Sequence, residues 1–284
     1  MTGRKLLKRQ KLRNNEYYDM QSVFDELYEN SLAKCEFKNL ISIITAEENI
    51  RLAYRNLKKN AGSRTPGTDG KTIADLAKMS EPELIGFVQQ KFNWYQPQSV
   101  RRKEIPKGNG KTRPLGIPTI MDRLIQQCVL QVMEPICEAK FCETSNGFRP
   151  NRGAENALAQ AEKHMQKSNL HIVIDIDIKG FFDNVNHGKL LRQIWTMGIH
   201  DKKLLSIISA MLKAEVAGIG FPEKGTPQGG ILSPLLSNIV LNELDWWITS
   251  QWVGMPTRHE YSGKIYENGT KDQSKSIGSS EKPI

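Results

Sequence analysis

The segment Leu170–Ile178 (LHIVIDIDI) constrains the fold of this chain more than any other. Its alternate residues are apolar from Leu170 to Ile178, whereas Asp175 and Asp177 fall between them. Because successive side chains of a strand point to opposite faces, the pattern predicts a strand that packs one face on helices and carries acid on the other. The sequence therefore predicts a half-buried strand with a carboxylate at its end.

The charge of the chain favours a polyanionic partner. Forty Lys and Arg against 31 Asp and Glu give a formal net charge of +9 over 284 residues. Charge alone fits either nucleic acid or an anionic membrane surface. The membrane is disfavoured, because no apolar run approaches the roughly 20 residues of a spanning helix, and the basic N-terminus lacks a secretory signal. We expect a cytoplasmic protein of the bacterial cytosol or nucleoid type, with four reduced cysteines in its core.

The N-terminal region reads as basic and helical. Its first thirteen residues contain no acid, which favours phosphate contact over a merely solvated face. The candidate nucleic-acid contacts there are Arg4, Lys5, Lys8 and Arg9. Apolar spacing predicts helices over Tyr17–Asn30, Ala46–Lys59, Thr119–Ala139, Ala154–Lys167, Gly188–Met197, Lys202–Lys213 and Leu232–Thr249.

Glycine-rich and polar segments separate these helices. Arg101–Gly116 predicts a basic β-hairpin, because Gly108-Asn109-Gly110 supplies turn residues between two strand-like runs. Ala61–Lys71 is a breaker, and Gly147–Gly153 is expected to form a loop. Beyond Gly254 the chain is polar and rich in Gly and Ser, which predicts an exposed tail.

Five ordered blocks between about residues 60 and 250 resemble the reverse transcriptases encoded by group II introns. The two most specific are DIKGFFDNVNH, which begins at Asp177, and TPQGGILSPLLSN, which begins at Thr226. The other three are PGTDG, IPKGNGKTRPLGIP and NGFRPNR. The resemblance implies an α/β (α+β) right-hand polymerase. Its parts would be a basic helical extension (1–60), fingers (61–168), a partial palm (169–253, with part of 188–225 returning to the fingers) and a polar tail (254–284).

The resemblance assigns Asp177 to catalysis. In that family the Asp at this position binds one of two Mg²⁺ ions, and Ile178 would add a backbone carbonyl. From the residues alone, an Asp-x-Asp strand end also suits a metal-dependent glycosyltransferase or a surface strand without function. The Tyr-Ala-Asp-Asp motif that supplies the other carboxylates is absent, and no Asp-Asp pair occurs in the 284 residues. We therefore expect this chain to be inactive alone.

Other residues are assigned by resemblance to the incoming nucleotide. Gly180 and Phe181 would present N–H groups to the triphosphate, and Phe182 would exclude a ribose 2′-hydroxyl. Gln228-Gly229 would lie against the nucleotide and template, where glycine admits close backbone approach. Lys107 and Arg113 in the hairpin would bind the β- and γ-phosphates. The ammonium group of lysine acts as a point charge, whereas the guanidinium of arginine can donate two parallel hydrogen bonds.

The GFRP loop is expected to lie along template and primer, with Arg149 and Arg152 on the backbone phosphates. A competing interpretation makes Asn151 the N-cap of the following helix. His187 is interpreted as a helix-start residue rather than a general base.

The sequence thus predicts RNA-directed DNA synthesis by a group II intron-encoded protein that also binds its intron RNA and assists splicing and mobility. Its partners would be intron RNA, an RNA template with a DNA primer, and a deoxynucleoside triphosphate. A homodimer is left open and no membrane partner is expected. The alternative is an RNA-binding splicing cofactor (maturase) without polymerase activity, which the basic regions would support without any metal site.

Overall fold

The chain forms two compact units, each built mainly of helices. The computed structural model describes residues 12–106, 110, 112–166, 172–226 and 229–253. Unit 1 comprises Met1–Lys140 and Gly180–Val240, and unit 2 comprises Phe141–Lys179 and Leu241–Ile284. The elements before the hairpin are α2 (Gln21–Leu32), α3 (Leu40–Ile44), α4 (Glu47–Lys59), η1 (Ala61–Arg64), α5 (Ile73–Leu76) and α6 (Glu81–Asn93).

Helix α7 (Ile120–Glu138) is the centre of the core of unit 1 and packs against α2, α3 and α4. Its predicted bounds are confirmed, with Thr119 as the N-cap. A buried amide network joins it to α4. Asn49 donates to the carbonyls of Ile44 (2.8 Å) and Cys128 (3.1 Å) and accepts from Gln131 Nε2 (2.8 Å). These bonds satisfy polar groups that would otherwise be costly to bury.

The Pro66–Gly70 block is held against the start of α7. Arg123 donates to the carbonyls of Gly62 (2.7 Å) and Thr65 (2.6 Å), which fixes the chain just before the block. A Cβ atom on Gly67 would lie 2.6 Å from Thr119 Cα. The absence of a side chain at Gly67 therefore lets two backbones touch, and the block has a packing role in unit 1.

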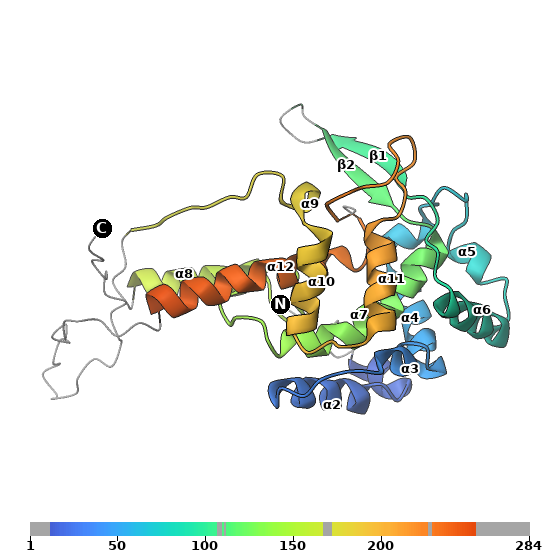
Figure 1. The fold of residues 1–284 in the computed structure, drawn as a ribbon, viewed down its shortest axis with the longest axis horizontal. Helices are drawn as coiled ribbons and strands as arrows, with labels where there is room; N and C mark the ends of the chain where they lie inside the picture. The colour runs from blue at the N-terminus through green and yellow to red at the C-terminus, as the bar shows by residue number, and fades with distance from the viewer. Residues whose placement is uncertain (1–11, 107–109, 111, 167–171, 227–228, 254–284) are drawn as a thin grey trace, which may run out of the picture. The chain divides into compact units, whose positions relative to one another are not determined.

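The predicted hairpin is confirmed. Strands β1 (Arg101–Pro106) and β2 (Thr112–Ile117) pair antiparallel, with Arg101 opposite Ile117 and Pro106 opposite Thr112. The base of β1 is tied to a later segment, because Val100 N–H donates to Glu215 O (2.7 Å) and Ala217 N–H donates to Val100 O (2.9 Å). Figure 1 shows this later segment looping beside the hairpin.

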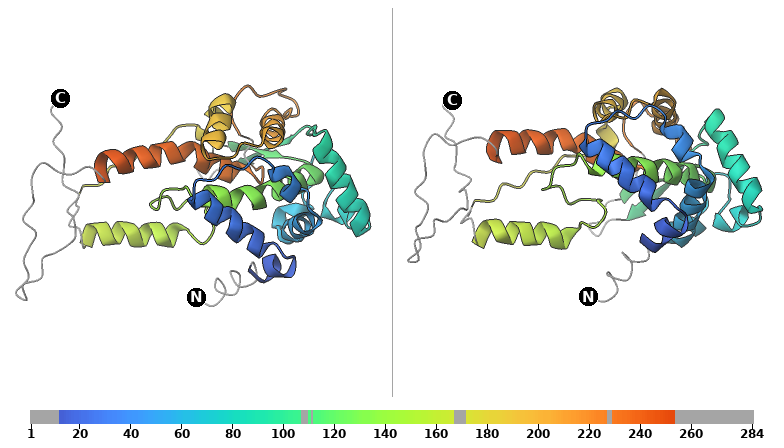
Figure 2. Two further views of the ribbon diagram at one scale, coloured as in Figure 1. Left: turned by 60° about the horizontal axis from the view of Figure 1, so that its bottom comes forward. Right: turned by 90° about the horizontal axis from the view of Figure 1, so that it is seen from below.

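The remaining helices of unit 1 lie near their predicted positions. These are α10 (His187–Thr196), α11 (Lys202–Leu212) and α12 (Ser233–Ile248), the last of which continues into unit 2. The short helix α9 (Phe181–Asn184) is an exception, because the sequence analysis predicts no helix there. Helices α10 and α11 pack together, as the views of Figures 1 and 2 show. Asn186 and Asp201 cap their N-termini through the N–H groups of Lys189 (2.8 Å) and Leu204 (3.0 Å). Among the described helices, none has the length and apolarity to cross a membrane.

Two predicted elements differ from the structure. The helix expected over Tyr17–Asn30 is Gln21–Leu32, because Asp19 adopts φ 55 and separates it from helical residues 12–17. The strand expected over Leu170–Ile178 is not formed across residues 172–178, which have no regular secondary structure. Ile172, Ile174 and Ile176 are 87%, 80% and 74% exposed. A strand needs a neighbour for its backbone hydrogen bonds, and no described residue pairs with this segment.

Unit 2 also contains α8 (Ala154–Gln166) and η2 (Thr249–Val253). The loop predicted at Gly147–Gly153 is confirmed, and it leads into α8. Within the unit, Asn242 Oδ1 accepts from Cys142 N–H (3.2 Å), and Cys142 Sγ lies 3.3 Å from Thr249 Oγ1. These contacts attach the start of the loop to the C-terminal part of α12 and to η2.

Replacing Gly67 with alanine should destabilise unit 1. The added Cβ has no room against the Thr119 backbone, so Gly67→Ala is expected to lower the free energy of unfolding by about 1–3 kcal/mol. Gly86→Ala is the matched control, because a Cβ there meets nothing within 4 Å on α6, and alanine should stabilise the helix by about 0.5–1 kcal/mol. Urea unfolding of both variants checks this. Equal midpoints would contradict the packing role of Gly67.

Candidate nucleotide-binding site

Helix α9 carries the two adjacent phenylalanines and starts at a glycine. Gly180 is its N-cap with φ 61, and its carbonyl accepts from Asn184 Nδ2 (2.9 Å). The rings of Phe181 and Phe182 pack edge to face, with centroids 5.5 Å apart and planes at 75°. On a strand, adjacent residues would face opposite ways and only one ring could enter the core. Here both residues lie on a helical turn and both are half-buried.

Hydrogen bonds join the segment around α9 to the start of the Thr226–Asn238 motif. We call the residues that make these bonds the clasp: Phe182, Val185, His187, Gly225 and Thr226. Thr226 N–H donates to Phe182 O (2.8 Å), and Gly225 N–H donates to Val185 O (2.7 Å). His187 Nε2 lies 2.7 Å from Gly225 O. The two motifs are therefore held edge to edge at fixed spacing within unit 1.

His187 has a larger part in this arrangement than its sequence position indicates. It is the first residue of α10, as predicted, but it is only 6% exposed. Because a carbonyl oxygen can only accept, Nε2 must carry the proton that binds Gly225 O. Its Nδ1 and the Thr226 hydroxyl are buried without a hydrogen-bond partner in the described part of the chain. Buried unpaired groups of this kind are uncommon in native interiors.

Two glycines allow the motif to pass close to its neighbours. Gly225 has φ +93, and a Cβ there would lie 3.0 Å from Phe182 O. Gly229 has φ +115, and a Cβ there would lie 2.4 Å from Gly116 O and 2.9 Å from Leu115 Cδ1 on β2. Both positions need a left-handed backbone and a missing side chain.

The middle of the motif is also held, because Ile231 N–H donates to Gln126 Oε1 on α7 (2.8 Å). Gly225 thus lies against the α9 region, Gly229 against β2 and Ile231 against α7, all within unit 1. This places the predicted nucleotide-facing residues Phe182 and Gly229 on one connected framework. Sequence reasoning identified both residues but missed Gly225 and the contact of His187. In the sequence, only the Gly-x-x-x-Gly spacing of Gly225 and Gly229 pointed to a role for Gly225.

Several predicted site residues lie outside the described residues. These are Arg4, Lys5, Lys8, Arg9, Lys107 and Gln228. Arg113 is placed only through its backbone, in β2 opposite Ile105. Their assigned roles stay predictions.

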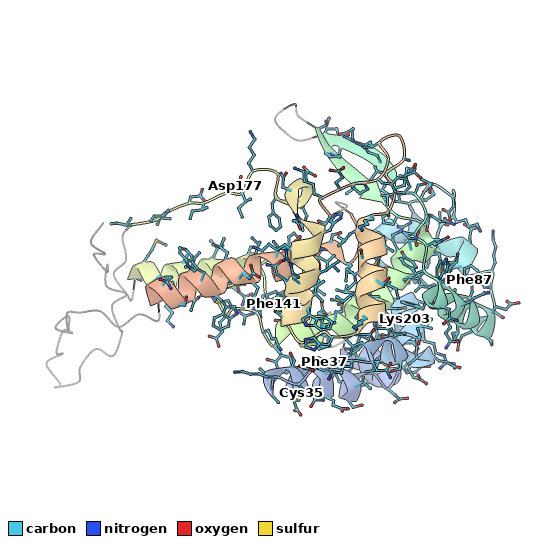
Figure 3. All side chains as sticks on the ribbon, viewed as in Figure 1. Cys35, Phe37, Phe87, Phe141, Asp177 and Lys203 are labelled. Carbon is cyan, nitrogen blue, oxygen red and sulfur yellow. The ribbon has the colours of Figure 1, made fainter. Side chains whose placement is uncertain are left out.

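Asp177 and Ile178 belong to unit 2, so their relation to the clasp is not defined by the structure. Both are exposed, and both lie in the extended segment without regular secondary structure. Figure 3 labels Asp177 on this segment. A carboxylate and a backbone carbonyl are hard oxygen donors of the kind that Mg²⁺ prefers. The donor set is incomplete, because the described residues contain no group of three His, Cys, Asp or Glu side chains that could hold a metal.

The two arginines of the GFRP loop hold the loop itself. Arg149 is buried and donates to the carbonyls of Cys142 (2.6 Å) and Ser145 (2.9 Å), and its guanidinium lies 5.4 Å from the ring centre of Phe141. Arg152 donates to Glu143 O. Contact of either side chain with template or primer stays a prediction.

The capping role considered for Asn151 is wrong. Gly153, not Asn151, precedes the first residue of α8, and its carbonyl accepts from the N–H groups of Asn156 (3.0 Å) and Ala157 (3.2 Å). Asn151 instead adopts φ 62 within the loop.

One family model and several curated relatives match the chain. A family model described as "Reverse transcriptase (RNA-dependent DNA polymerase)" matches residues 105–266. Protein YkfC of Escherichia coli is 34% identical over 231 residues, which cover 78% of this chain and 60% of the relative. Group II intron-encoded protein LtrA of Lactococcus lactis is 38% identical over 240 residues, which cover 80% of this chain and 38% of the relative. The chain therefore spans less than two thirds of the length of both relatives, 60% of one and 38% of the other.

More distant similarity extends to eukaryotic relatives and to solved structures. A putative COX1/OXI3 intron 1 protein of Saccharomyces cerevisiae is 29% identical and covers 80% of this chain and 26% of the relative. A chain of a partial Cas6-RT-Cas1–Cas2 complex aligns with a TM-score of 0.47 at 22% identity, covering 74% of this chain and 35% of that chain.

Removing the His187 side chain should loosen the clasp. His187→Ala leaves Gly225 O without its donor, a loss of about 1–3 kcal/mol. Amide hydrogen exchange at Gly225 and Thr226 should therefore accelerate by roughly fivefold to 150-fold. His187→Gln should exchange at an intermediate rate, because its amide can still donate.

His200→Ala is the matched control for this experiment. His200 also approaches a backbone carbonyl, Trp195 O at 3.1 Å, but lies outside the clasp. The His200→Ala variant should leave the amide exchange rates of Gly225 and Thr226 unchanged. Unaltered exchange in His187→Ala would show that the side chain does not hold the clasp.

Proposed function

The chain belongs to the reverse transcriptase (RNA-dependent DNA polymerase) family, and we propose that it forms the nucleotide-binding part of an intron-encoded polymerase. The parent activity would be RNA-directed DNA synthesis by a protein that also binds its intron RNA and assists splicing. The single observation that carries this proposal is the clasp, because it joins the two motifs that resemblance assigns to the incoming nucleotide. We assign residues 61–168 to the fingers and 169–253 to the partial palm.

Three features of unit 1 support a nucleotide site at the clasp. The N–H groups of Gly180 and Phe181 have no partner among the described residues, which suits donors to a triphosphate. The ring of Phe182 is half-buried beside Phe181, so its position is restrained. The backbone of Gly229 lies against β2, and a side chain at this position would clash with Gly116 O.

These residues would select and orient the substrate. The backbone of α9 would hold the triphosphate, while the ring of Phe182 would occupy the space that a ribose 2′-hydroxyl needs. Lys107 and Arg113 would neutralise the outer phosphates from the hairpin. The Thr226–Gly229 backbone would support the nucleotide from the other side. Fixed spacing matters here, because misplacement of reacting groups by about 1 Å costs roughly a hundredfold in rate.

Asp177 and Ile178 would hold Mg²⁺, which when bound stabilises charge on the attacking and leaving oxygens of phosphoryl transfer. One carboxylate side chain is too few for a pair of metal ions. No Asp-Asp pair occurs among the 284 residues. We infer that synthesis requires further carboxylates from outside this sequence, and that the chain alone is inactive.

The RNA-binding splicing cofactor remains the second candidate. The net charge of +9 supports it, since phosphate contact needs no metal. The glycosyltransferase interpretation is set aside, because it rested on Asp175 and Asp177 alone, and the reverse transcriptase family model matches residues 105–266, a range that includes both. The intron RNA partner, a homodimer and the cytoplasmic location stay predictions.

Primer extension tests the proposal. A chimera that continues this chain with the downstream polymerase region of the intron-encoded relative should extend a DNA primer on an RNA template with Mg²⁺ and deoxynucleotides. Asp177→Ala in that chimera should reduce extension to the level of the no-enzyme control. RNA affinity should change by less than about 0.5 kcal/mol, since Asp177 is exposed. Full extension by Asp177→Ala would refute the assignment, and RNA binding without extension by the unmutated chimera would favour the splicing cofactor.

Substitution of Phe182 should relax sugar selection. Because a 2′-hydroxyl would overpack against the ring at about 1–3 kcal/mol, Phe182→Ala should raise ribonucleotide incorporation relative to deoxynucleotide by roughly fivefold to 150-fold. Phe221→Ala is the control, as that exposed ring lies outside α9. The ratio of kcat/KM for the two sugars in the same chimera measures this. An unchanged ratio for Phe182→Ala would remove the residue from sugar selection.

A further inference from the structure

Unit 1 contains a hollow that the nucleotide site does not use. It lies between the segment preceding α3 and the turn from α10 to α11, and its volume is about 840 Å³. That volume falls within the roughly 300–1,000 Å³ typical of ligand sites. We name it the lysine groove, defined by Lys38, Trp195, His200, Lys202 and Lys203.

The two walls of the lysine groove are joined by backbone bonds. Phe37 N–H donates to Gly198 O (2.8 Å), and His200 N–H donates to Phe37 O (2.8 Å). Gly198 has φ +87, and a Cβ there would lie 3.0 Å from Cys35 O, so close approach again depends on glycine. Figure 3 labels Cys35 and Phe37 on the segment before α3, and Lys203 on α11. The groove is therefore a preformed feature of unit 1.

The acids of the groove are already engaged. Glu36 binds Lys38 Nζ (3.0 Å) and His200 Nδ1 (3.2 Å), and the hydrogen bond from Lys38 holds the pKa of Glu36 below its usual range. Asp201 is buried, and its two oxygens accept from the N–H groups of Ile41 (3.1 Å) and Leu204 (3.0 Å).

The remaining charge of the groove is positive. Lys202 and Lys203 are exposed and have no ion-pair partner among the described residues. They lie in the first turn of α11, directly after its N-cap residue Asp201. The groove thus presents two free ammonium groups to solvent, complementary to phosphate.

An aromatic surface lies beside these cations. The rings of Trp195 and His200 stack with centroids 4.1 Å apart and planes at 15°. The two ring nitrogens of His200 lie 3.2 Å from Glu36 Oε2 and 3.1 Å from Trp195 O, and these contacts restrain the stack. Trp195 is still 38% exposed, which leaves indole surface for a further ring. Aromatic surface next to free cations is the combination that binds unpaired bases with their phosphates.

We propose that the lysine groove binds single-stranded nucleic acid, with phosphates at Lys202 and Lys203 and an unpaired base stacked on Trp195. The site goes beyond the proposed polymerase function, because it requires neither Asp177 nor the clasp. A duplex fits less well, since its bases are already stacked on each other. RNA and DNA share the chemistry that the groove recognises.

Fluorescence anisotropy of the whole chain with labelled oligoadenylate RNA tests the proposal. The double variant Lys202→Ala/Lys203→Ala should weaken binding and lower the slope of log affinity against log salt by about 1.4, or roughly 0.7 for each single-strand phosphate. Trp195→Ala should weaken binding by roughly fivefold to 150-fold, while Trp195→Phe should retain most of the affinity. Thermal unfolding of each variant checks that it is folded.

Lys58→Ala/Lys59→Ala is the control, because it removes another exposed pair of adjacent lysines, at the end of α4. It should keep the affinity and the salt slope nearly unchanged. Equal losses in both double variants would indicate general charge attraction and overturn the proposal. Unchanged binding in both Trp195 variants would remove the stacking contact and also overturn it.

Three further probes identify the ligand class. Oligodeoxyadenylate should compete with the RNA, and tighter RNA binding would add recognition of the 2′-hydroxyl. Equal affinity for a blunt duplex of the same length would contradict the proposal. The proposal would also be contradicted if Lys202→Ala/Lys203→Ala abolished binding to phosphatidylserine vesicles but left RNA binding unchanged. Asp177→Ala should bind RNA normally, so failure here is distinguishable from failure of the polymerase assignment.

Discussion

The hydrogen bond from Thr226 N–H to Phe182 O is the contact on which the proposed site depends. It joins two motifs that are far apart in sequence and fixes the spacing between the phenylalanine pair and the glycine-rich segment. Gly225 permits the contact because a Cβ there would press on Phe182 O, and His187 reinforces it through Gly225 O. The bond therefore helps to fix the position of Phe182 relative to Gly229, on which the proposed sugar selection depends.

Helix α7 in the core of unit 1 holds the segment that follows the clasp. Helix α7 holds Ile231 through Gln126 and carries the packing of Gly67 against Thr119. A second set of backbone bonds, between Phe37 and the Gly198–His200 turn, closes the lysine groove at the other end of α10. Helix α10 thus connects two candidate binding surfaces, one for a nucleotide and one for a single strand. Each relies on a glycine that lets two backbones meet.

The sequence predicted the elements whose formation depends mainly on neighbouring residues. The amphipathic helices α4, α7, α10 and α11 and the β1–β2 hairpin lie where apolar spacing and turn residues placed them. Helix α6 was missed although Ser80 and Glu83 form a capping box at its start. The strand at 170–178 failed for another reason, because alternation indicates which face should be buried but not which strand will pair. Asp177 and Phe182 came from motif resemblance, whereas the clasp arises from contacts between distant segments that no local pattern encodes.

The most direct test of this account is ligand-dependent hydrogen exchange in the primer-extending chimera. Primer–template with a matched deoxynucleoside triphosphate and Mg²⁺ should protect the amides of Phe181–Phe182 and of Gly229–Gly230 together. The same mixture without the nucleotide should protect neither segment. Protection of only one of the two, or of neither when the nucleotide is bound, would contradict the claim that the clasp forms the walls of a single nucleotide site.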